Sequence, residues 1–184
     1  MIQSDNPLEL LPIVDETGKV IGSATRQKCH DGSLILHPVV HLHLLSDDGK
    51  LYLQRRPDWK TIQPGKWDTA VGGHIGYGED VEDALHRETF EELGLRNICA
   101  KKVTEYTFRT NVDAEYVHVY IGVSSDTVVP SEETAGGRFW SFEEIEQNIG
   151  KGLFTPNFED EYRMLRDNGD FDGFICNLTT DATS

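Results

Sequence analysis

Basic side chains and cysteines are scarce in this 184-residue sequence. Lysine and arginine number 17 against 32 aspartates and glutamates, which gives a formal net charge of −15. Such a charge repels polyanions, so nucleic acids and anionic membranes are excluded as expected partners. The three cysteines, Cys29, Cys99 and Cys176, lie far apart and form no C-x-x-C pair. Neither a disulfide framework nor a zinc knuckle is therefore expected.

Long apolar runs and secretion signals are also missing. No stretch reaches the roughly 20 apolar residues of a membrane-spanning helix. The N-terminal MIQSDNPLELLP has no basic segment followed by an apolar one, so we expect a cytoplasmic protein. No repeat, low-complexity run or linker divides the chain, which favours a single domain over residues 1–184. Both a monomer and a homodimer remain open.

The order of apolar runs predicts strands interleaved with helices. Strands are predicted at 10–15, 20–25, 38–45, 51–55, 103–109, 116–124 and 137–140. Helices are predicted at about 80–93, from a capping box at 141–144 to about 148, and at about 157–166 before a polar tail. The segment 26–32 could be helix or loop. We expect an N-terminal hairpin (about 10–25), a core (about 34–150) and a C-terminal helix, in an α/β fold whose mixed sheet is flanked by helices.

The stretch 73–95, GHIGYGEDVEDALHRETFEELGL, has the most specific pattern in the chain. Glycines punctuate its first residues, which predicts a loop, and the helix that follows stops at a further glycine. Val81 and Leu85 share one helical stripe with Glu88 and Glu92. The stripe is therefore apolar where it begins and acidic where it ends.

Three carboxylates crowd the last turn of this helix. Glu88, Glu91 and Glu92 stand at i, i+3 and i+4, where repulsion and burial are costly without a cation. Hard divalent cations prefer carboxylate oxygens, so the cluster predicts a Mg²⁺ or Mn²⁺ site. Arg87 is the only Lys or Arg of the stretch, and we expect it to pair with Glu79 and leave the glutamates to the metal. A solvated acidic helix would explain the charges but neither the glycines nor the lone arginine.

The spacing of these residues resembles the signature of the Nudix hydrolases. Gly73 is followed by five residues and Glu79, then by seven residues and Arg-Glu-Thr-Phe-Glu-Glu-Leu-Gly-Leu. Thr89 is the one departure, because the family usually has an aliphatic residue there. The resemblance implies an α/β/α sandwich and a hydrolase that cleaves a diphosphate linkage in a small nucleoside-diphosphate-type compound.

The resemblance also implies roles for single residues. The Gly73 carbonyl would join Glu88, Glu91 and Glu92 as Mg²⁺ ligands, while Arg87 and Glu79 orient the cluster. A water on the metal would attack phosphorus. Glu91 or Glu92 is the first candidate for general base, followed by Glu115, Glu132 and Glu133.

Other residues resemble the isopentenyl-diphosphate isomerase branch of the Nudix superfamily, over most of residues 10–165. They are Gln54-Arg55-Arg56, Pro64 to Asp68, Gly73-His74, His30 and His37. The resemblance implies a second metal site at His30, His37 and His74, with Asp113 and Glu115 as the matching acidic pair. The alternative is that these histidines are structural. We expect His41 and His43, on one face of strand 38–45, to be hydrogen-bonded structural residues.

Two departures from the isomerase sequences argue for hydrolase activity over isomerase activity. The isomerases have a catalytic cysteine immediately before the glycine-histidine pair, and this chain has Gly72 there. They also tend to lose glutamates from the acidic helix, and this chain keeps them. Because protonation of an alkene needs a positioned acid, isomerase activity is not expected. A non-catalytic ligand-binding module is a third hypothesis, against which the complete carboxylate set argues.

The loop before residue 73 carries candidate substrate-binding residues. Arg55, Arg56 and Lys60 could contact phosphate oxygens, or they could form a solvated basic rim. Trp59 could stack on a base or another flat group.

Overall fold

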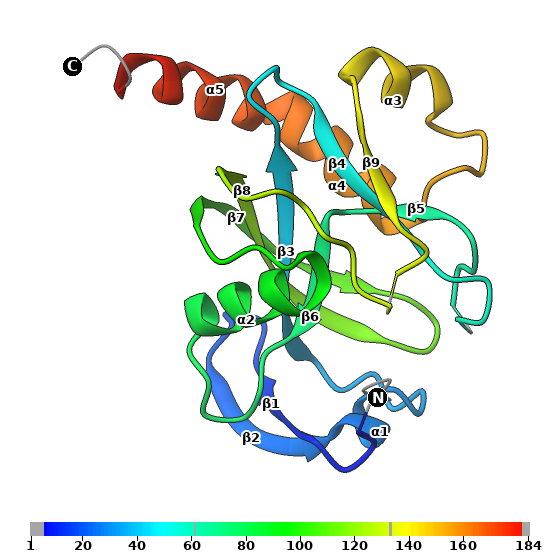
Figure 1. The fold of residues 1–184 in the computed structure, drawn as a ribbon. Coiled ribbons are helices and arrows are strands. Elements are labelled where there is room, and N and C mark those ends of the chain that lie inside the picture. Colours follow the sequence, from blue (N-terminus) through cyan, green and yellow to red (C-terminus); the bar gives the residue numbers. More distant parts are fainter. Residues whose placement is uncertain (1–5, 61, 133, 182–184) are drawn as a thin grey trace.

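The computed structural model describes residues 6–60, 62–132 and 134–181 (Figure 1). The strands are β1 (Leu10–Val14), β2 (Val20–Thr25), β3 (His37–Leu45), β4 (Leu51–Arg55), β5 (Trp67–Asp68), β6 (Val71–His74), β7 (Ile98–Arg109), β8 (Ala114–Ser124) and β9 (Gly137–Trp140). The helices are α1 (Arg26–Cys29), α2 (Val81–Leu93), α3 (Phe142–Asn148), α4 (Pro156–Asn168) and α5 (Asp170–Asp181). None of the described helices is long and apolar enough to cross a membrane.

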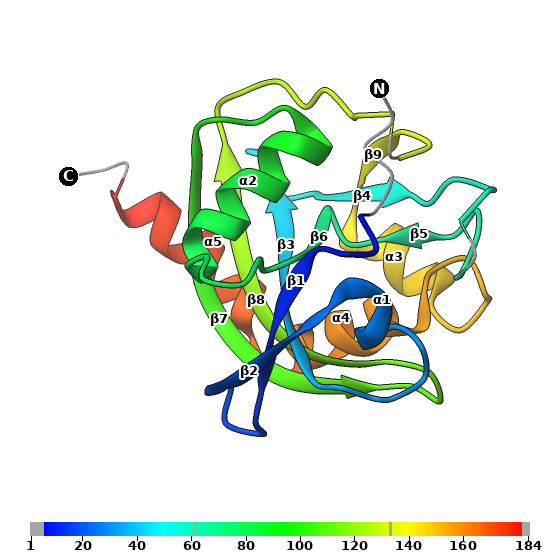
Figure 2. The ribbon, with the colours of Figure 1, turned by 90° about the horizontal axis from the view of Figure 1, so that it is seen from below.

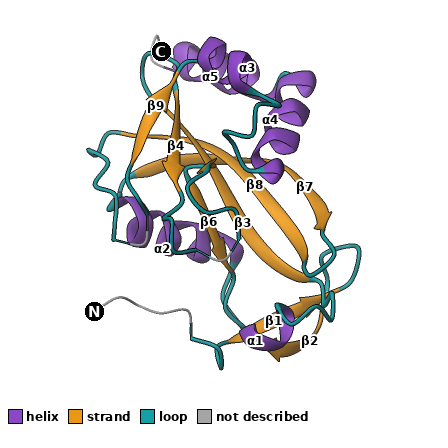
Figure 3. Cartoon of the chain, turned by 90° about the vertical axis from the view of Figure 1, so that its right-hand side faces the viewer, coloured by secondary structure: helices purple, strands orange, loops and turns teal. Residues whose placement is uncertain are grey.

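A seven-stranded mixed sheet forms the centre of the molecule. Its main order is β5-β4-β3-β8-β7, with β6 paired to β3 and β9 paired to β4. The pair β3 and β8 is parallel, and the other pairs are antiparallel. Helix α2 covers one face, and α4 and α5 lie against the other (Figure 3). The predicted α/β/α sandwich with a mixed sheet is confirmed.

Alternation along β3 assigns its side chains to the two faces. Val40, Leu42 and Leu44 pack in a buried cluster with residues of α2, which include Ala84, Leu85 and Leu93. Val39 and Leu45 pack in a second cluster with residues of α4 and α5, which include Phe158, Tyr162 and Phe171. Successive side chains of a strand point to opposite faces, so β3 is buried on both sides. The odd-numbered histidines of β3 belong to the α4 face.

The predicted N-terminal hairpin is present, and it lies at the beginning of β3. Strands β1 and β2 pair antiparallel, and the Val14 amide donates to the Leu36 carbonyl. Figure 2 shows the hairpin together with α1 beside the start of β3. The undecided segment 26–32 contains α1, whose N-cap Thr25 accepts a hydrogen bond from the Lys28 amide. This short helix brings His30 to the same end of the sheet.

Helix α2 has nearly the bounds that the sequence predicts. It ends at Leu93, and Gly94 takes a left-handed conformation with φ of 70°. Thr89, the departure from the family pattern, is fully buried, and its hydroxyl donates to the Leu85 carbonyl at 2.6 Å. The internal hydrogen bond explains how a polar side chain replaces an aliphatic one here.

The predicted polar tail is wrong, because α5 occupies much of it. Gly169 ends α4 in a left-handed conformation with φ of 75° and turns the chain into α5. Phe171 and Phe174 of α5 are buried against the α4 side of the sheet. The two aromatic residues stand three apart on one helical face, and acidic neighbours obscure this short apolar stripe in the sequence.

Candidate active site

Strand β6 carries glycines on both of its faces. Its register with β3 pairs Gly73 with Val40 and Gly72 with His41. A Cβ built on Gly73 would stand 2.0 Å from Cδ of Glu88, so only glycine allows that glutamate to approach the strand. A Cβ on Gly72 would instead meet Cδ2 of His41 at 3.6 Å, an ordinary contact distance. The two glycines therefore separate a cluster on the α2 face from a cluster on the α4 face.

Arg87 is the centre of the cluster on the α2 face. Its Nε and Nη2 donate to the two carboxylate oxygens of Glu79 at 2.7 and 2.8 Å, as the sequence predicts. Nη2 also donates to the His74 carbonyl at 2.9 Å. The expectation that Arg87 leaves the other glutamates free is wrong, because Nη1 lies 2.6 Å from Glu88 Oε1 and 3.1 Å from Glu91 Oε2. In this structure the arginine offsets the repulsion among the carboxylates.

The carboxylates of this cluster differ in burial and in pKa. Glu88 is mostly buried, and burial raises its pKa against the opposing effect of Arg87. Hydrogen bonds from Arg87 lower the pKa of Glu79 although burial opposes this. Glu91 is exposed, and Glu92 accepts a hydrogen bond from Gln54 Nε2 at 2.9 Å. Glu88 thus lies in a position where a bound cation would stabilise its charge.

Three histidine rings gather on the other side of β6. His30, His37 and His74 have ring centroids 4.9 to 5.3 Å apart. His30 Nδ1 lies 2.9 Å from Asp113 Oδ2, and its Nε2 lies 2.9 Å from the Nε2 of His74. Glu115 is the β8 partner of His37 in the sheet register. The structure thus brings together residues from the C-terminal end of α1, from β3 and β6, and from the beginning of β8 that the sequence leaves far apart.

The protonation of this histidine cluster suits metal ligation. His37 Nδ1 lies 2.9 Å from the Ile35 carbonyl, which can only accept, so Nδ1 carries the proton and Nε2 holds a lone pair. That Nε2 is buried without a hydrogen-bond partner among the described residues. Burial lowers the pKa of His37 and holds the pKa of His74 well below its usual value. His30, His37 and His74 can approach one ion together, and so can His37, Asp113 and Glu115.

His41 and His43 form a separate network around Glu161, a residue that the sequence interpretation missed. His41 Nδ1 lies 3.0 Å from Glu161 Oε2, and His43 Nε2 lies 2.6 Å from Oε1. The Tyr106 hydroxyl donates to the same carboxylate at 2.7 Å. Burial opposes ionisation of His41, but the Glu161 charge prevails and raises its pKa to about 9. Both histidines are hydrogen-bonded, as predicted. An acidic residue on the apolar stripe of α4 is the signal that could have revealed this network.

Two of the candidate substrate-binding residues, Arg55 and Arg56, contact residues of the loop that follows β4 or of β5. Arg55 Nε donates to the Gly65 carbonyl at 3.1 Å, and Arg56 Nη1 lies 3.2 Å from Asp68 Oδ2. Lys60 Nζ stands 5.0 Å from the ring centre of Trp59, which is 62% exposed. The loop therefore presents the exposed Trp59 ring, and the arginines near it already contact other residues of the protein.

The loop that follows β8 reaches the end of α2. The Ser131 amide donates to the Glu92 carbonyl at 2.9 Å, and the Val129 amide donates to the Leu93 carbonyl at 2.9 Å. These bonds hold the turn with the exposed Glu132 near the glutamate cluster. Glu133 lies outside the described residues.

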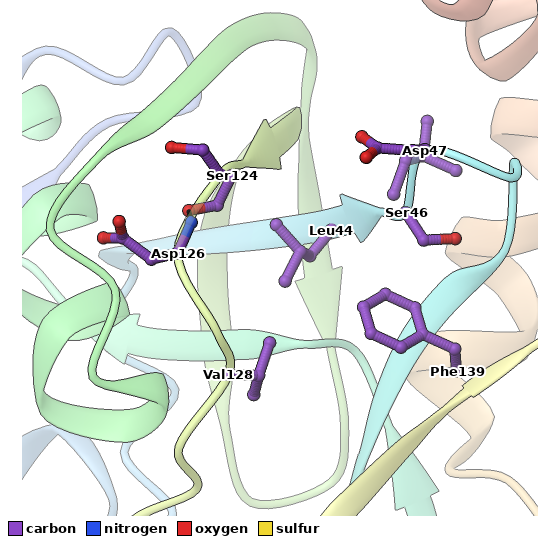
Figure 4. A pocket seen from close by; sticks show the side chains of 9 residues that line it. Leu44, Ser46, Asp47, Ser124, Asp126, Val128 and Phe139 are labelled. Carbon is purple, nitrogen blue, oxygen red and sulfur yellow. Dashed lines mark hydrogen bonds between the residues drawn. The ribbon is translucent and has the colours of Figure 1, made fainter.

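A pocket of about 240 Å³ lies at the other end of the sheet (Figure 4). Its walls come from the ends of β3 and β8 and from β9, and they include Leu44, Asp47, Ser124 and Phe139. Asp126 also lines it, but its carboxylate accepts hydrogen bonds from the amides that follow α2. His37 begins β3 and Leu44 lies near its end, so this pocket is remote from the histidine cluster.

The fold and these clusters define a class of protein, an α/β/α sandwich whose site joins a glycine-rich loop to an acidic helix end. Comparison with known proteins identifies the family. The NUDIX domain model matches residues 35–162. The chain belongs to the Nudix family and is an enzyme of the Nudix hydrolase type.

The relatives of this chain include both hydrolases and isomerases by name. An isopentenyl-diphosphate Delta-isomerase of Streptomyces coelicolor is 32% identical over 81% of this chain and 79% of its own length. An uncharacterized Nudix hydrolase of the same species is 32% identical over 86% of this chain and 88% of its own. A solved structure from Deinococcus radiodurans superposes with a TM-score of 0.72 at 26% identity, over 85% of this chain and 98% of that one.

Proposed function

We propose that this protein is a divalent-metal-dependent hydrolase that cleaves a diphosphate linkage in a small nucleoside-diphosphate-type compound. The observation that carries the proposal is the complete carboxylate set at the end of α2, with Glu88 seated under Gly73 and Arg87 bridging it to Glu79. Oxygen ligands of this kind favour Mg²⁺ or Mn²⁺. We propose Glu88, Glu91 and Glu92 as the metal-binding side chains.

The backbone of β6 contributes to the same proposed site. The Ile75 amide donates to the Pro38 carbonyl, and the next pair in the register is His74 with Val39. In an antiparallel ladder this arrangement turns the Gly73 carbonyl toward β3 and the Gly72 carbonyl toward the open side of β6. We therefore propose the Gly72 carbonyl as the backbone metal ligand in place of the Gly73 carbonyl, which is directed into the ladder with β3.

The chain's own side chains would position the reactants. A bound Mg²⁺ would supply a polarised phosphoryl group and a water of lowered pKa. Arg87 fixes Glu79 and Glu88, and Gln54 fixes Glu92. Glu91, the exposed member, and Glu92 are our first candidates to accept the proton of the attacking water, and Glu132 and Glu115 are the further candidates.

The histidine cluster is our proposed second metal site. His30, His37, His74 and Glu115 supply mostly nitrogen ligands, and the unpartnered His37 Nε2 supports the assignment. Imidazole nitrogens fit Zn²⁺, Mn²⁺ or Fe²⁺ better than Mg²⁺. The two sites would therefore differ in the metal that they prefer.

Substrate recognition is proposed for the loop before β5. Trp59 would stack on a flat group, and Arg55, Arg56 and Lys60 would approach phosphate oxygens. The hydrogen bonds of the two arginines to their own loop argue that they also fix its shape.

An isomerase is the second candidate, because the histidine cluster and several relatives' names favour it. Gly72 counts against it, since this position carries no acid that could protonate an alkene. A ligand-binding module without turnover would not need the full carboxylate set.

A screen of diphosphate-linked metabolites with Mg²⁺, read out as phosphate and nucleotide products, tests the proposal. We expect Mg²⁺-dependent release from at least one nucleoside-diphosphate compound. Release from none of them, by a folded protein that converts isopentenyl diphosphate, would replace the hydrolase with the isomerase.

A further inference from the structure

Asp113 lies in the turn between β7 and β8, and its carboxylate is held at both oxygens. Oδ1 accepts a hydrogen bond from the Ala114 amide at 2.9 Å, and Oδ2 lies 2.9 Å from His30 Nδ1. The turn is closed by two further bonds, because the Thr110 amide donates to the Asp113 carbonyl and the Asp113 amide donates to the Thr110 hydroxyl. The Asp113 side chain is only 14% exposed. A fixed carboxylate therefore faces one nitrogen of the His30 ring.

The other nitrogen of the His30 ring faces the histidine cluster. His30 Nε2 lies 2.9 Å from His74 Nε2, and the ring centroid of His30 lies 4.9 Å from that of His37. A carboxylate can only accept, so the contact with Asp113 places a proton on Nδ1 and assigns the lone pair of the neutral ring to Nε2. The Ile35 carbonyl holds His37 Nδ1 in the same way. Both rings are therefore held at Nδ1, which leaves Nε2 as the nitrogen for a shared ion.

Asp113 and Glu115, the acidic pair at the beginning of β8, differ in what they contact. Asp113 Oδ1 lies 4.0 Å from His37 Nε2, so distance alone would allow Asp113 to share an ion with His37 and Glu115. Both Asp113 oxygens, however, already accept hydrogen bonds. No residue that the structure describes donates a hydrogen bond to the Glu115 carboxylate. Ligation by Asp113 would compete with the bond that holds His30, whereas ligation by Glu115 would break no hydrogen bond.

We propose that Asp113 is a positioning residue that holds His30 at Nδ1 and directs Nε2 to the metal, and that Glu115 supplies the carboxylate ligand. The inference rests on the second metal site proposed above and gives the two members of its acidic pair different roles. Partners of this kind fix the tautomer and the orientation of ligating histidines, and their loss typically lowers metal affinity by about 10- to 100-fold.

Asp113→Asn is the sharpest substitution, because its oxygen can stay with the Ala114 amide while its NH₂ group donates to His30 Nδ1. The ring proton then moves to Nε2 and blocks ligation. The probe is Zn²⁺ alone, and its affinity is measured by calorimetry without any diphosphate. A His37→Ala, His74→Ala double variant gives the baseline for Zn²⁺ bound elsewhere. We expect Asp113→Asn and Asp113→Ala to weaken binding about tenfold or more.

Asp31→Asn is the matched control for the loss of one negative charge beside His30. The Asp31 carboxylate accepts hydrogen bonds from Lys28 Nζ and from the Ser33 amide, and none from the ring of a histidine in the described chain. We expect this variant to change Zn²⁺ affinity less than about twofold. Zn²⁺ affinity that stays within about twofold of wild type in both Asp113 variants would overturn the inference, and so would an equal loss in Asp31→Asn.

Nitrogen-15 spectra of the metal-free protein at about pH 8 separate positioning from ligation. In wild type the His30 proton should be on Nδ1, and in Asp113→Asn it should shift toward Nε2. Glu115→Gln should weaken Zn²⁺ binding and leave the His30 tautomer unchanged. A wild-type His30 protonated at Nε2 would overturn the role of Asp113 alone. A wild type that binds no more Zn²⁺ than the double variant would overturn the second metal site and this inference with it.

Discussion

The two faces of β6 carry clusters of opposite chemistry on a single strand. On the Gly73 side the clustered polar atoms are carboxylate oxygens bridged by Arg87. On the Gly72 side they are mostly imidazole nitrogens, of which His37 and His74 are kept neutral by burial. Because Gly72 and Gly73 have no side chains, Glu88 on one face and His41 on the other can lie close to the backbone of β6. The comparison teaches that one strand can separate a cluster of carboxylate oxygens from a cluster of imidazole nitrogens.

The largest effect on turnover should come from removing one carboxylate of the cluster at the end of α2. We expect Glu92→Gln to lower kcat on the best screened substrate by roughly 10² to 10⁴, the range of a lost general base or charge. The fold should persist, because removing one charge also relieves repulsion. Near wild-type turnover by the purified variant would contradict the proposed metal cluster. Glu82→Gln, in the first turn of the same helix, is the control and should change kcat little.

The two glycines should respond unequally to alanine. Gly73→Ala overlaps Glu88 and should lower the free energy of unfolding by about 2–3 kcal/mol or more, with loss of activity. Gly72→Ala meets only ordinary contacts and should leave the melting temperature nearly unchanged. Thermal unfolding of both variants measures the difference. Equal melting temperatures would mean that Glu88 is not fixed under the strand.

Metal content should distinguish the two faces. Protein purified without chelator or affinity-column metal should contain Zn²⁺, Mn²⁺ or Fe²⁺, and a His37→Ala, His74→Ala double variant should lose it. Imidazole must be neutral to ligate, and burial lowers the pKa of both His37 and His74, so occupancy should persist as pH drops through 6.5 and fall only at lower pH. Glu88→Gln is the matched control and should keep the transition metal. Elemental analysis decides, and identical metal content in wild type and double variant would reduce these histidines to structural residues.

The Glu161 network should give a smaller dependence of stability on pH. The pKa of His41 is about 9 in the folded protein and near 6.5 when unfolded, so the folded state binds this proton more tightly. The stabilisation is full below pH 6.5 and is lost as pH rises through 9, with a slope on the order of 1 kcal/mol per pH unit. In Glu161→Gln the pKa of His41 is no longer raised, so this slope should disappear. Urea unfolding at several pH values measures it, and identical slopes in both proteins would refute the network's role.

The smallest effect is expected with isopentenyl diphosphate. Wild-type protein should not convert it to the dimethylallyl isomer, because Gly72 supplies neither an acid nor a thiolate. Product analysis after long incubation is the measurement, with an active isomerase as positive control. Conversion above background would contradict the hydrolase assignment and favour the isomerase.

Local spacing made much of the α2 side predictable. The helix and its stop at Gly94 follow from periodicity and a left-handed glycine, and the Arg87–Glu79 pair follows from one cation among many carboxylates. The approach of Glu88 to Gly73 is not visible in the sequence, because it depends on how α2 packs on β6. The bridging of Glu88 and Glu91 by Arg87 also depends on that packing.

The sequence by itself determined the family signature, the mixed α/β architecture and the candidate residues for holding a cation. Only the tertiary structure decided that His30, His37 and His74 converge. His37 and His74 are on the paired strands β3 and β6, and His30 reaches them from the C-cap of α1. The tertiary structure alone placed Glu161 of α4 beneath His41 and turned the polar tail into α5. Helical and strand periods specify which face a side chain takes along its own element, whereas the partner across that face is chosen by packing between elements distant in the chain.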